Sequence, residues 1–283
     1  MGNCNERSSI ARYPLHMSNP TPAQQYLEHC RTLLDTIAAQ QPQIEQASRW
    51  FADAILAGRM VHVFGSGHSR IMVEEMWPRY GSFPGFNPIV ELSLTFHNNV
   101  VGANGQRQAM FLENVTGLAA RILRNFDIKS TDAALIISSS GCNVVPVEFA
   151  EHCKAAGMKV VAIVSQRHSE ASTSRHPKSV KLGDVADLVL DTGAPPGDSM
   201  VRIDGLESPV APGSTVGGCV LINSIKAQVA AMLTDAGAPP KVLTASCIMD
   251  ATRATALFES AYDEHAHRLA KMYEKVGPAN SPD

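Results

Sequence analysis

Two patterns of hydrophobic residues alternate along the chain, one typical of strands and the other typical of helices. Short apolar runs without alternation indicate buried parallel strands, at Met60–Phe64, Pro88–Val90, Ala133–Ile137, Lys159–Val164 and Leu188–Leu190. Apolar residues at three- and four-residue steps indicate helices, at Ser69–Tyr80, Gln108–Asn125, Val144–Ala156, Thr215–Thr234 and Ala251–Tyr273. This order predicts an α/β fold, a doubly wound five-stranded parallel sheet with helices on both faces.

The residues before the first predicted strand have a helical pattern. Apolar positions from Tyr26 to Ile37 recur at helical steps, and Pro42 opens a second helix that ends at Gly58. We expect an antiparallel helical hairpin over 21–58, the α/β domain with its C-terminal helix over 59–275, a disordered tail at 1–20 and a short tail at 276–283.

Composition narrows the class of protein. The 283 residues are 45% hydrophobic and 18% charged, with a net charge of −3, which argues against a nucleic-acid surface. We see no apolar run near 20 residues and no signal-peptide core, so no membrane span is expected. The six cysteines are scattered without a C-x-x-C pair, which is typical of free thiols in a reducing cytoplasm.

A hydroxyl-rich turn follows the third predicted strand and precedes the helix at Val144. Free backbone N–H groups and hydroxyls at a helix N-terminus bind anions, phosphate above all. No Lys follows Gly141 as a nucleoside triphosphate loop requires, so we predict a phosphate monoester of a small molecule. The alternative is that these side chains only cap the helix. The candidate residues are Ser138, Ser139, Ser140 and Asn143.

A glycine-rich turn follows the first predicted strand. Its sixth position is Arg70 instead of glycine, and no acidic residue follows about 20 residues later, so we predict no nicotinamide cofactor. Its glycines allow a ligand to approach the backbone closely. The candidate ligand-binding residues here are Gly65, Ser66, Gly67, His68 and Ser69.

Two adjacent carboxylates, Glu74 and Glu75, lie in the following helix. Helix neighbours point about 100° apart, so only one of them can face the strand ends. In a closed pocket such a carboxylate has a raised pKa and can move a proton between carbons. The alternative is an exposed surface pair.

Together these segments resemble the SIS (sugar isomerase) domain from about residue 40 to 240. The turns 65–69 and 138–143 and the helix start at 212–215 resemble the three segments of its phosphosugar site, which implies a flavodoxin-like fold and substrate binding by Ser214 and Thr215. Segment 73–80 is similar to the helix that carries the catalytic glutamate of sedoheptulose-7-phosphate isomerases, which places that glutamate at Glu75. Segments 174–177, 186–191 and 197–198 look more like an uncharacterised bacterial SIS subfamily, which implies no particular activity.

The chain departs from that family pattern at two places. Asn143 stands where the phosphate loop usually ends in a hydroxyl, and the predicted helix Thr215–Thr234 lacks the histidine that heptose isomerases use. Another group must then supply the second acid or base. Candidates are His97, near a histidine position of arabinose-5-phosphate isomerases, His176, beside the possible phosphate ligand Arg175, and also His68 and Glu91.

The leading hypothesis is an aldose–ketose phosphosugar isomerase that works through an enediol, with Glu75 as base and His97 or His176 as partner. The alternatives are a non-catalytic phosphosugar sensor and an aminosugar-phosphate deaminase or etherase-type lyase. No cofactor is expected. No metal is expected either, because His265 and His267 are two apart on a predicted helix and cannot face one ion together. The resemblance implies a cytoplasmic homodimer or homotetramer with sites near the subunit interface, to which His16 or His29 could contribute from a neighbour.

Overall fold

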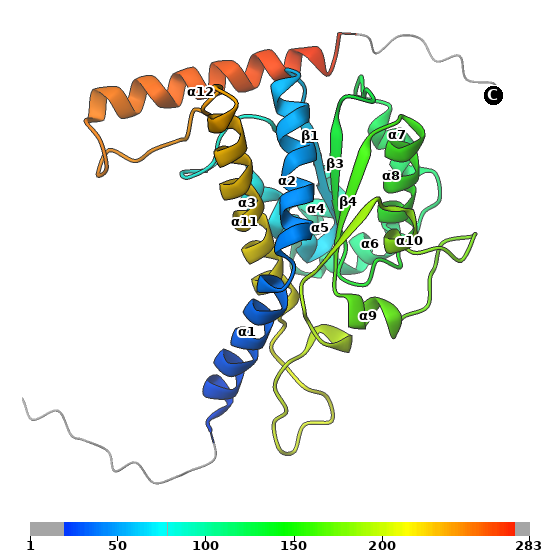
Figure 1. The fold of residues 1–283 in the computed structure, drawn as a ribbon. Coiled ribbons are helices and arrows are strands. Elements are labelled where there is room, and N and C mark those ends of the chain that lie inside the picture. Colours follow the sequence, from blue (N-terminus) through cyan, green and yellow to red (C-terminus); the bar gives the residue numbers. More distant parts are fainter. Residues whose placement is uncertain (1–19, 78, 275–283) are drawn as a thin grey trace, which may run out of the picture.

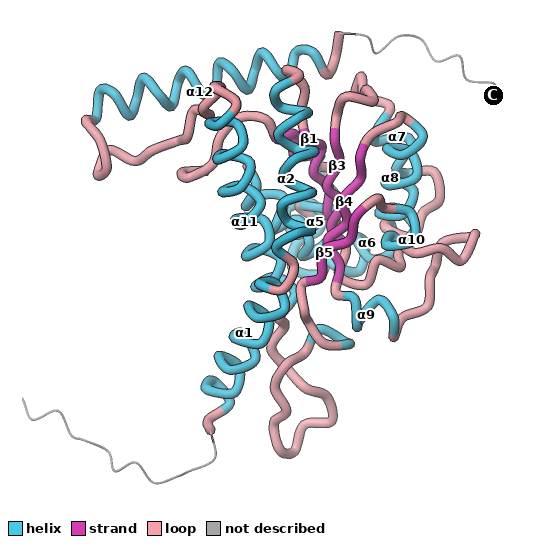
Figure 2. The backbone as a smooth tube through the Cα atoms, viewed as in Figure 1, coloured by secondary structure: helices cyan, strands magenta, loops and turns pink. Residues whose placement is uncertain are grey.

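The computed structural model describes residues 20–77 and 79–274 (Figure 1). Its centre is one parallel sheet in the order β2-β1-β3-β4-β5 (Figure 2). The expected five-stranded α/β fold is therefore confirmed. The strands are β1 (Val61–Gly65), β2 (Phe86–Pro88), β3 (Ala133–Ile137), β4 (Lys159–Val164) and β5 (Leu188–Asp191).

Helices cover both faces of this sheet (Figure 1). They are α1 (Pro22–Ala38), α2 (Gln41–Leu56), α3 (Arg70–Met76), α4 (Leu92–Thr95), α5 (His97–Val101), α6 (Gly105–Leu112), α7 (Leu118–Leu123), α8 (Val144–Ala155), α9 (Gln166–Glu170), α10 (Leu182–Val185), α11 (Ser214–Asp235) and α12 (Ala251–Lys271). Short 3₁₀ turns lie at Gly67–Ser69, Gly102–Asn104 and Pro196–Asp198.

Alternate residues of the central strand serve the two halves of the core. Leu135 and Ile137 pack with α2, α3 and α11 on one face, whereas Ala134 and Ile136 pack with α7 and α8 on the other. All five residues of β3 are buried, which explains why its sequence shows no polar alternation.

Three details differ from the sequence prediction. The expected helix 108–125 is broken, because Gly117 has φ +84° and starts a separate helix, α7. The expected antiparallel hairpin over 21–58 is wrong, because α1 and α2 follow one another in nearly the same direction (Figure 1). Ala39 keeps a right-handed helical conformation between them, so the chain only bends ahead of Pro42.

The third difference concerns α11. This helix is long and apolar enough to cross a membrane, judged by its length and composition only. Its residues Leu221, Ile222 and Ile225 are buried in the core against the sheet layer. A core helix of a folded domain passes the same test, so the length and composition of α11 carry no membrane assignment.

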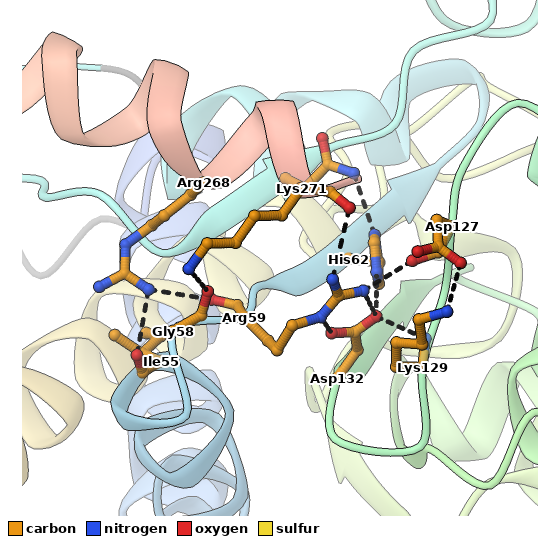
Figure 3. Close-up of polar contacts among 10 residues, drawn as sticks. Ile55, Gly58, Arg59, His62, Asp127, Lys129, Asp132, Arg268 and Lys271 are labelled. Carbon is orange, nitrogen blue, oxygen red and sulfur yellow. Dashed lines mark hydrogen bonds and ion pairs between the residues drawn. The ribbon is translucent and has the colours of Figure 1, made fainter. Parts of the chain in front are cut away.

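An ionic cluster lies at the amino ends of strands β1 and β3 (Figure 3). Asp132 accepts two hydrogen bonds from the Arg59 guanidinium, at 2.6 and 2.9 Å, and one from the backbone N–H of Lys129 at 2.8 Å. His62 Nε2 lies 3.2 Å from the same carboxylate. Burial alone would raise the pKa of Asp132, but the hydrogen bonds from His62 and Arg59 hold it below its ordinary value.

Residues at this end of the strands also hold the C-terminal helix in place. Arg268 of α12 donates to the carbonyl oxygens of Ile55 and Arg59, both at 3.0 Å (Figure 3). Trp77 Nε1 donates to His265 Nε2 at 3.2 Å, farther along α12. These contacts fix α12 across the end of the domain where the strands begin, so the carboxyl ends of the strands stay uncovered by it (Figure 1).

Candidate functional site

A cavity of about 310 Å³ lies beyond the carboxyl ends of β1 and β3. This is the point where the strand order reverses, since β1 is followed by β2 on one side and by β3 on the other. Ligands of open parallel sheets bind in such a crevice. The turn after β1, the turn after β3 and the start of α11 all reach it.

Most of the predicted substrate-binding residues line this one cavity. They are Ser66, Gly67, His68, Ser69, Ser138, Ser139, Ser140, Asn143, Ser214 and Thr215. Gly65 is the last residue of β1, next to them, and its backbone is so close to Ser69 that a Cβ at position 65 would lie 2.8 Å from the Ser69 carbonyl oxygen. Arg175 is exposed and donates from Nη1 to Asn143 Oδ1 at the edge of the turn. Their roles in binding stay a prediction.

Glu75, the predicted base, lies outside this cavity. Its Oε1 accepts a hydrogen bond from Asn223 at 3.0 Å, its Oε2 pairs with Arg79, and Lys226 Nζ is 3.8 Å away. Asn223 is nine residues into α11, about 14 Å along the helix from the cavity at Ser214. Glu75 instead lines a separate cavity of about 490 Å³ with Tyr80 and Tyr262 of the same subunit.

The surroundings of Glu75 favour its ionised form. Burial alone would raise the pKa of Glu75, but hydrogen bonds from Asn223 and Arg79 and the charge of Lys226 hold it below the ordinary value. Lys226 is buried and its own pKa is lowered by that burial. This arrangement is that of a charge pair between α3 and α11.

Neither of the two predicted histidine partners, His97 and His176, lines the cavity. His176 is buried, its Nε2 lies 3.6 Å from Glu151 Oε2, and its Nδ1 accepts from the backbone N–H of Lys178. It therefore faces α8. His97 is 3% exposed, and its Nδ1 has no hydrogen-bond partner in the described part of the chain. Glu91, the carboxylate candidate, caps α4 by accepting from Leu94 N.

A different carboxylate, Glu113, lies in the cavity wall where helix 108–125 breaks. Its Oε2 accepts a hydrogen bond from Ser66 Oγ at 2.7 Å. Burial raises the pKa of Glu113, while hydrogen bonds from Ser66 and Asn143 and the charges of Arg175 and His97 oppose that rise. Glu113 was not selected from the sequence, because a continuous helix would have placed it on an ordinary helix surface.

Three buried polar atoms at the cavity have no hydrogen-bond partner among the described residues. They are Gln106 Oε1, Ser139 Oγ and His168 Nδ1, from α6, the turn after β3 and α9. Buried polar atoms in folded proteins are almost always paired, and an exception requires an explanation. A polar ligand in the cavity would supply the missing partners.

The two helix N-termini at the cavity differ in charge. At α11, the Asp198 carboxylate accepts from Gly213 N, Ser214 N and Ser214 Oγ at 3.0, 2.8 and 2.6 Å. Asp198 holds a left-handed backbone, with φ +53°, to make these contacts. No side chain caps α8 at Asn143. An anion is therefore favoured at the start of α8 and disfavoured at that of α11.

No group of three or more His, Cys, Asp or Glu side chains with metal-binding geometry occurs in residues 20–77 and 79–274.

His168, Gln106 and Asp198 were not selected from the sequence as ligand-binding residues, since each lies outside the three recognisable turns. The free sulfhydryl of Cys142 is buried beside Ser140, and burial raises its pKa. The predicted contribution of His16 falls outside the described residues, as do nearly all of 1–20 and 276–283.

Comparison with known proteins gives two kinds of match. The SIS domain family model matches residues 25–165. A UPF0309 protein of Streptomyces coelicolor is 34% identical over 230 residues, which cover 80% of this chain and 89% of that protein. A UPF0309 protein of Halalkalibacterium halodurans is 33% identical over 216 residues, covering 76% and 87%.

Solved structures are more distant. Phosphoheptose isomerase GmhA from Neisseria gonorrhoeae is 12% identical, with a TM-score of 0.46, over 73% of this chain and 95% of that one. The Vibrio vulnificus NanR protein complexed with ManNAc-6P is 14% identical, with a TM-score of 0.42, over 76% and 62%. At this level of identity and overlap neither protein assigns an activity to this chain.

Proposed function

We propose that this chain, which belongs to the UPF0309 family of SIS-domain proteins, binds a phosphorylated sugar in the cavity beyond β1 and β3. The observation that carries the proposal is the set of unpaired polar atoms at Gln106, Ser139 and His168, which surround one cavity between hydroxyl-rich turns. A small polyhydroxylated ligand offers hydrogen-bond partners to all three.

The charge at the two helix starts supports one orientation of that ligand. The phosphate lies at the start of α8, among the hydroxyls of Ser138, Ser139 and Ser140, where no side chain caps the helix. Asp198 at the start of α11, which accepts from Gly213 N and Ser214 Oγ, repels a second anion, so the uncharged end of the sugar lies there. A free sugar lacks the group that the α8 end binds.

The reaction that we propose is aldose–ketose isomerisation through an enediol. Binding the phosphate away from the reacting carbons suits this chemistry, because it holds C1 and C2 in place without taking part. A half-buried carboxyl with a raised pKa, Glu113, is available at the cavity to exchange a proton with carbon. We also propose that the protein works in the cytoplasm as a homodimer or homotetramer.

A binding-only sensor is the second candidate. The observation that favours it is the position of Glu75, whose carboxylate faces Arg79, Asn223 and Lys226 instead of the cavity. In this candidate Glu75 is the only group able to transfer the proton. Because Glu75 does not reach the cavity, a single subunit binds phosphosugars without converting them.

Isotope exchange separates the two candidates. The protein is incubated in D₂O with a panel of aldose and ketose phosphates, and deuterium at C1 and C2 is followed by mass spectrometry. Uptake with one member supports the isomerase and identifies its substrate class. Binding of a phosphosugar without uptake across the panel, in protein shown to be folded, would leave the sensor and refute the isomerase.

A further inference from the structure

We infer that Glu113 is the proton-transferring carboxylate of this cavity and that His97 is its positioning residue. The inference rests on the proposed function and concerns the same site. It replaces Glu75, which the sequence suggested, with a residue that the sequence did not select.

The backbone fixes Glu113 between the two ligand-binding turns. Its N–H donates to the Ala109 carbonyl oxygen at 3.0 Å, and its own carbonyl oxygen accepts from Val145 N, in the first turn of α8, at 2.9 Å. Its side chain accepts from Ser66, in the turn after β1, at 2.7 Å. Glu113 is therefore held at both ends, which positions its carboxyl relative to a phosphate at the start of α8.

The environment of Glu113 suits a group that exchanges a proton with a substrate. Burial raises its pKa, and hydrogen bonds from Ser66 and Asn143 oppose that rise. A catalytic acid or base is most effective when its pKa is near the working pH. Glu75 differs in this respect, because Arg79 and Lys226 stabilise its ionised form and occupy its oxygens.

His97, the first residue of α5, is close enough to Glu113 for its charge to act on that carboxyl. It is 3% exposed, its Nδ1 has no partner among the described residues, and its charge acts on the Glu113 carboxyl. It does not line the cavity. His97 therefore acts on Glu113 through its charge, and it does not touch a sugar bound in the cavity.

The proton step balances within the substrate. The Glu113 carboxylate takes the proton from C2 of the open-chain aldose phosphate, and the C2–H electron pair forms the C1–C2 double bond of the enediol. The proton of the C2 hydroxyl passes to the C1 oxygen, so the C1 carbonyl becomes a hydroxyl and the C2 hydroxyl becomes a carbonyl. Glu113 then returns its proton to C1, so C1 is reduced, C2 is oxidised and the protein is unchanged.

The test compares Glu113→Gln with Glu74→Gln, a matched control on the exposed side of α3 whose carboxylate pairs with Arg70. We expect Glu113→Gln to lower deuterium exchange by at least about 100-fold, in line with the usual contribution of general acid–base catalysis. Its phosphosugar Kd, measured by calorimetry, should stay within about threefold of wild type, since the amide keeps a hydrogen-bond acceptor for Ser66. Glu74→Gln should match wild type in both.

Two further variants make the result specific. Glu113→Asp keeps the acid but shortens the side chain, so exchange should be intermediate. His97→Gln should lower kcat more than it raises KM and should displace the pH profile of exchange, which a merely structural change would not do.

Each failure has its own signature. If Glu113→Gln exchanges deuterium within threefold of wild type, the inference is wrong, but the isomerase proposal is unaffected. The same holds if Glu75→Gln is the variant that loses exchange and Glu113→Gln is not. Phosphosugar binding with no exchange in wild type would overturn it and leave a binding protein. Absence of binding to every sugar phosphate would instead refute the proposed function itself.

Discussion

Replacing Asp132 by Asn tests how the start of the sheet is held together. The Asp132 side chain is fully buried and accepts from Arg59 and from Lys129 N, with His62 Nε2 3.2 Å away. The substitution keeps the shape of the side chain but removes its charge. It leaves the Arg59 guanidinium, whose side chain is 12% exposed, without its ionic partner.

Removing one member of a buried ion pair typically costs about 3–5 kcal/mol, because the remaining charge stays buried without compensation. Since 1 kcal/mol shifts the melting temperature of a domain of this size by about 2–4 °C, we expect Tm to fall by roughly 6–20 °C. The loss should be smaller in acid. The pKa of Asp132 is lowered in the folded state, so its contribution is complete above the ordinary Asp pKa of about 3.9 and disappears as pH falls through the lowered value.

The assay is urea unfolding followed by circular dichroism at several pH values. Asp53→Asn, at an exposed position of α2, is the matched control and should change the free energy of unfolding by less than about 0.5 kcal/mol. A loss below about 1 kcal/mol for Asp132→Asn at pH 7, or a loss that does not shrink near pH 3, would refute the reasoning. Ligand binding should be unaffected in the folded variant, because the cluster and the cavity lie at opposite ends of the strands.

Three shorter predictions concern other contacts. Ser139→Ala removes an unpaired buried hydroxyl, so phosphosugar Kd measured by calorimetry should rise about 10- to 100-fold, the cost of a hydrogen bond to a charged group. Asp198→Ala uncaps α11 at Ser214, so the free energy of unfolding in urea should fall by about 1 kcal/mol. Burial and Arg268 lower the pKa of His265, which accepts from Trp77 as the neutral form. The protection factors of the α12 amides, which are corrected for the intrinsic pH dependence of exchange, should therefore fall as pH falls below about 6.5. Unchanged values in these assays would contradict each prediction.

Buried strands were the most predictable part of the fold. The bounds predicted for β3 and β4 agree with the structure, because strands covered on both faces leave continuous apolar runs in the sequence. The two turns after β1 and β3 were also recognisable, since their serines and glycines follow strands directly. What these features share is that local sequence decides them.

Tertiary contacts decide the parts that the sequence did not predict. Apolar periodicity continues across Gly117, so it could not reveal the break that brings Glu113 to the cavity. Asp198 lies in a turn far from α11 in the sequence, and its role at the start of α11 depends on a contact across 16 positions. The bend between α1 and α2 was missed for a similar reason, because α11 packs along both helices and no turn residue marks their direction.

Paired calorimetric titrations test the central claim most directly. The protein is titrated with each sugar phosphate of the panel, with the same sugar lacking its phosphate, and with inorganic phosphate alone. The account predicts that one phosphorylated sugar binds at least about 100-fold more tightly than its free counterpart, and that Ser139→Ala weakens that binding. Equal affinity for phosphorylated and free sugars, or no binding by folded protein across the panel, would contradict it.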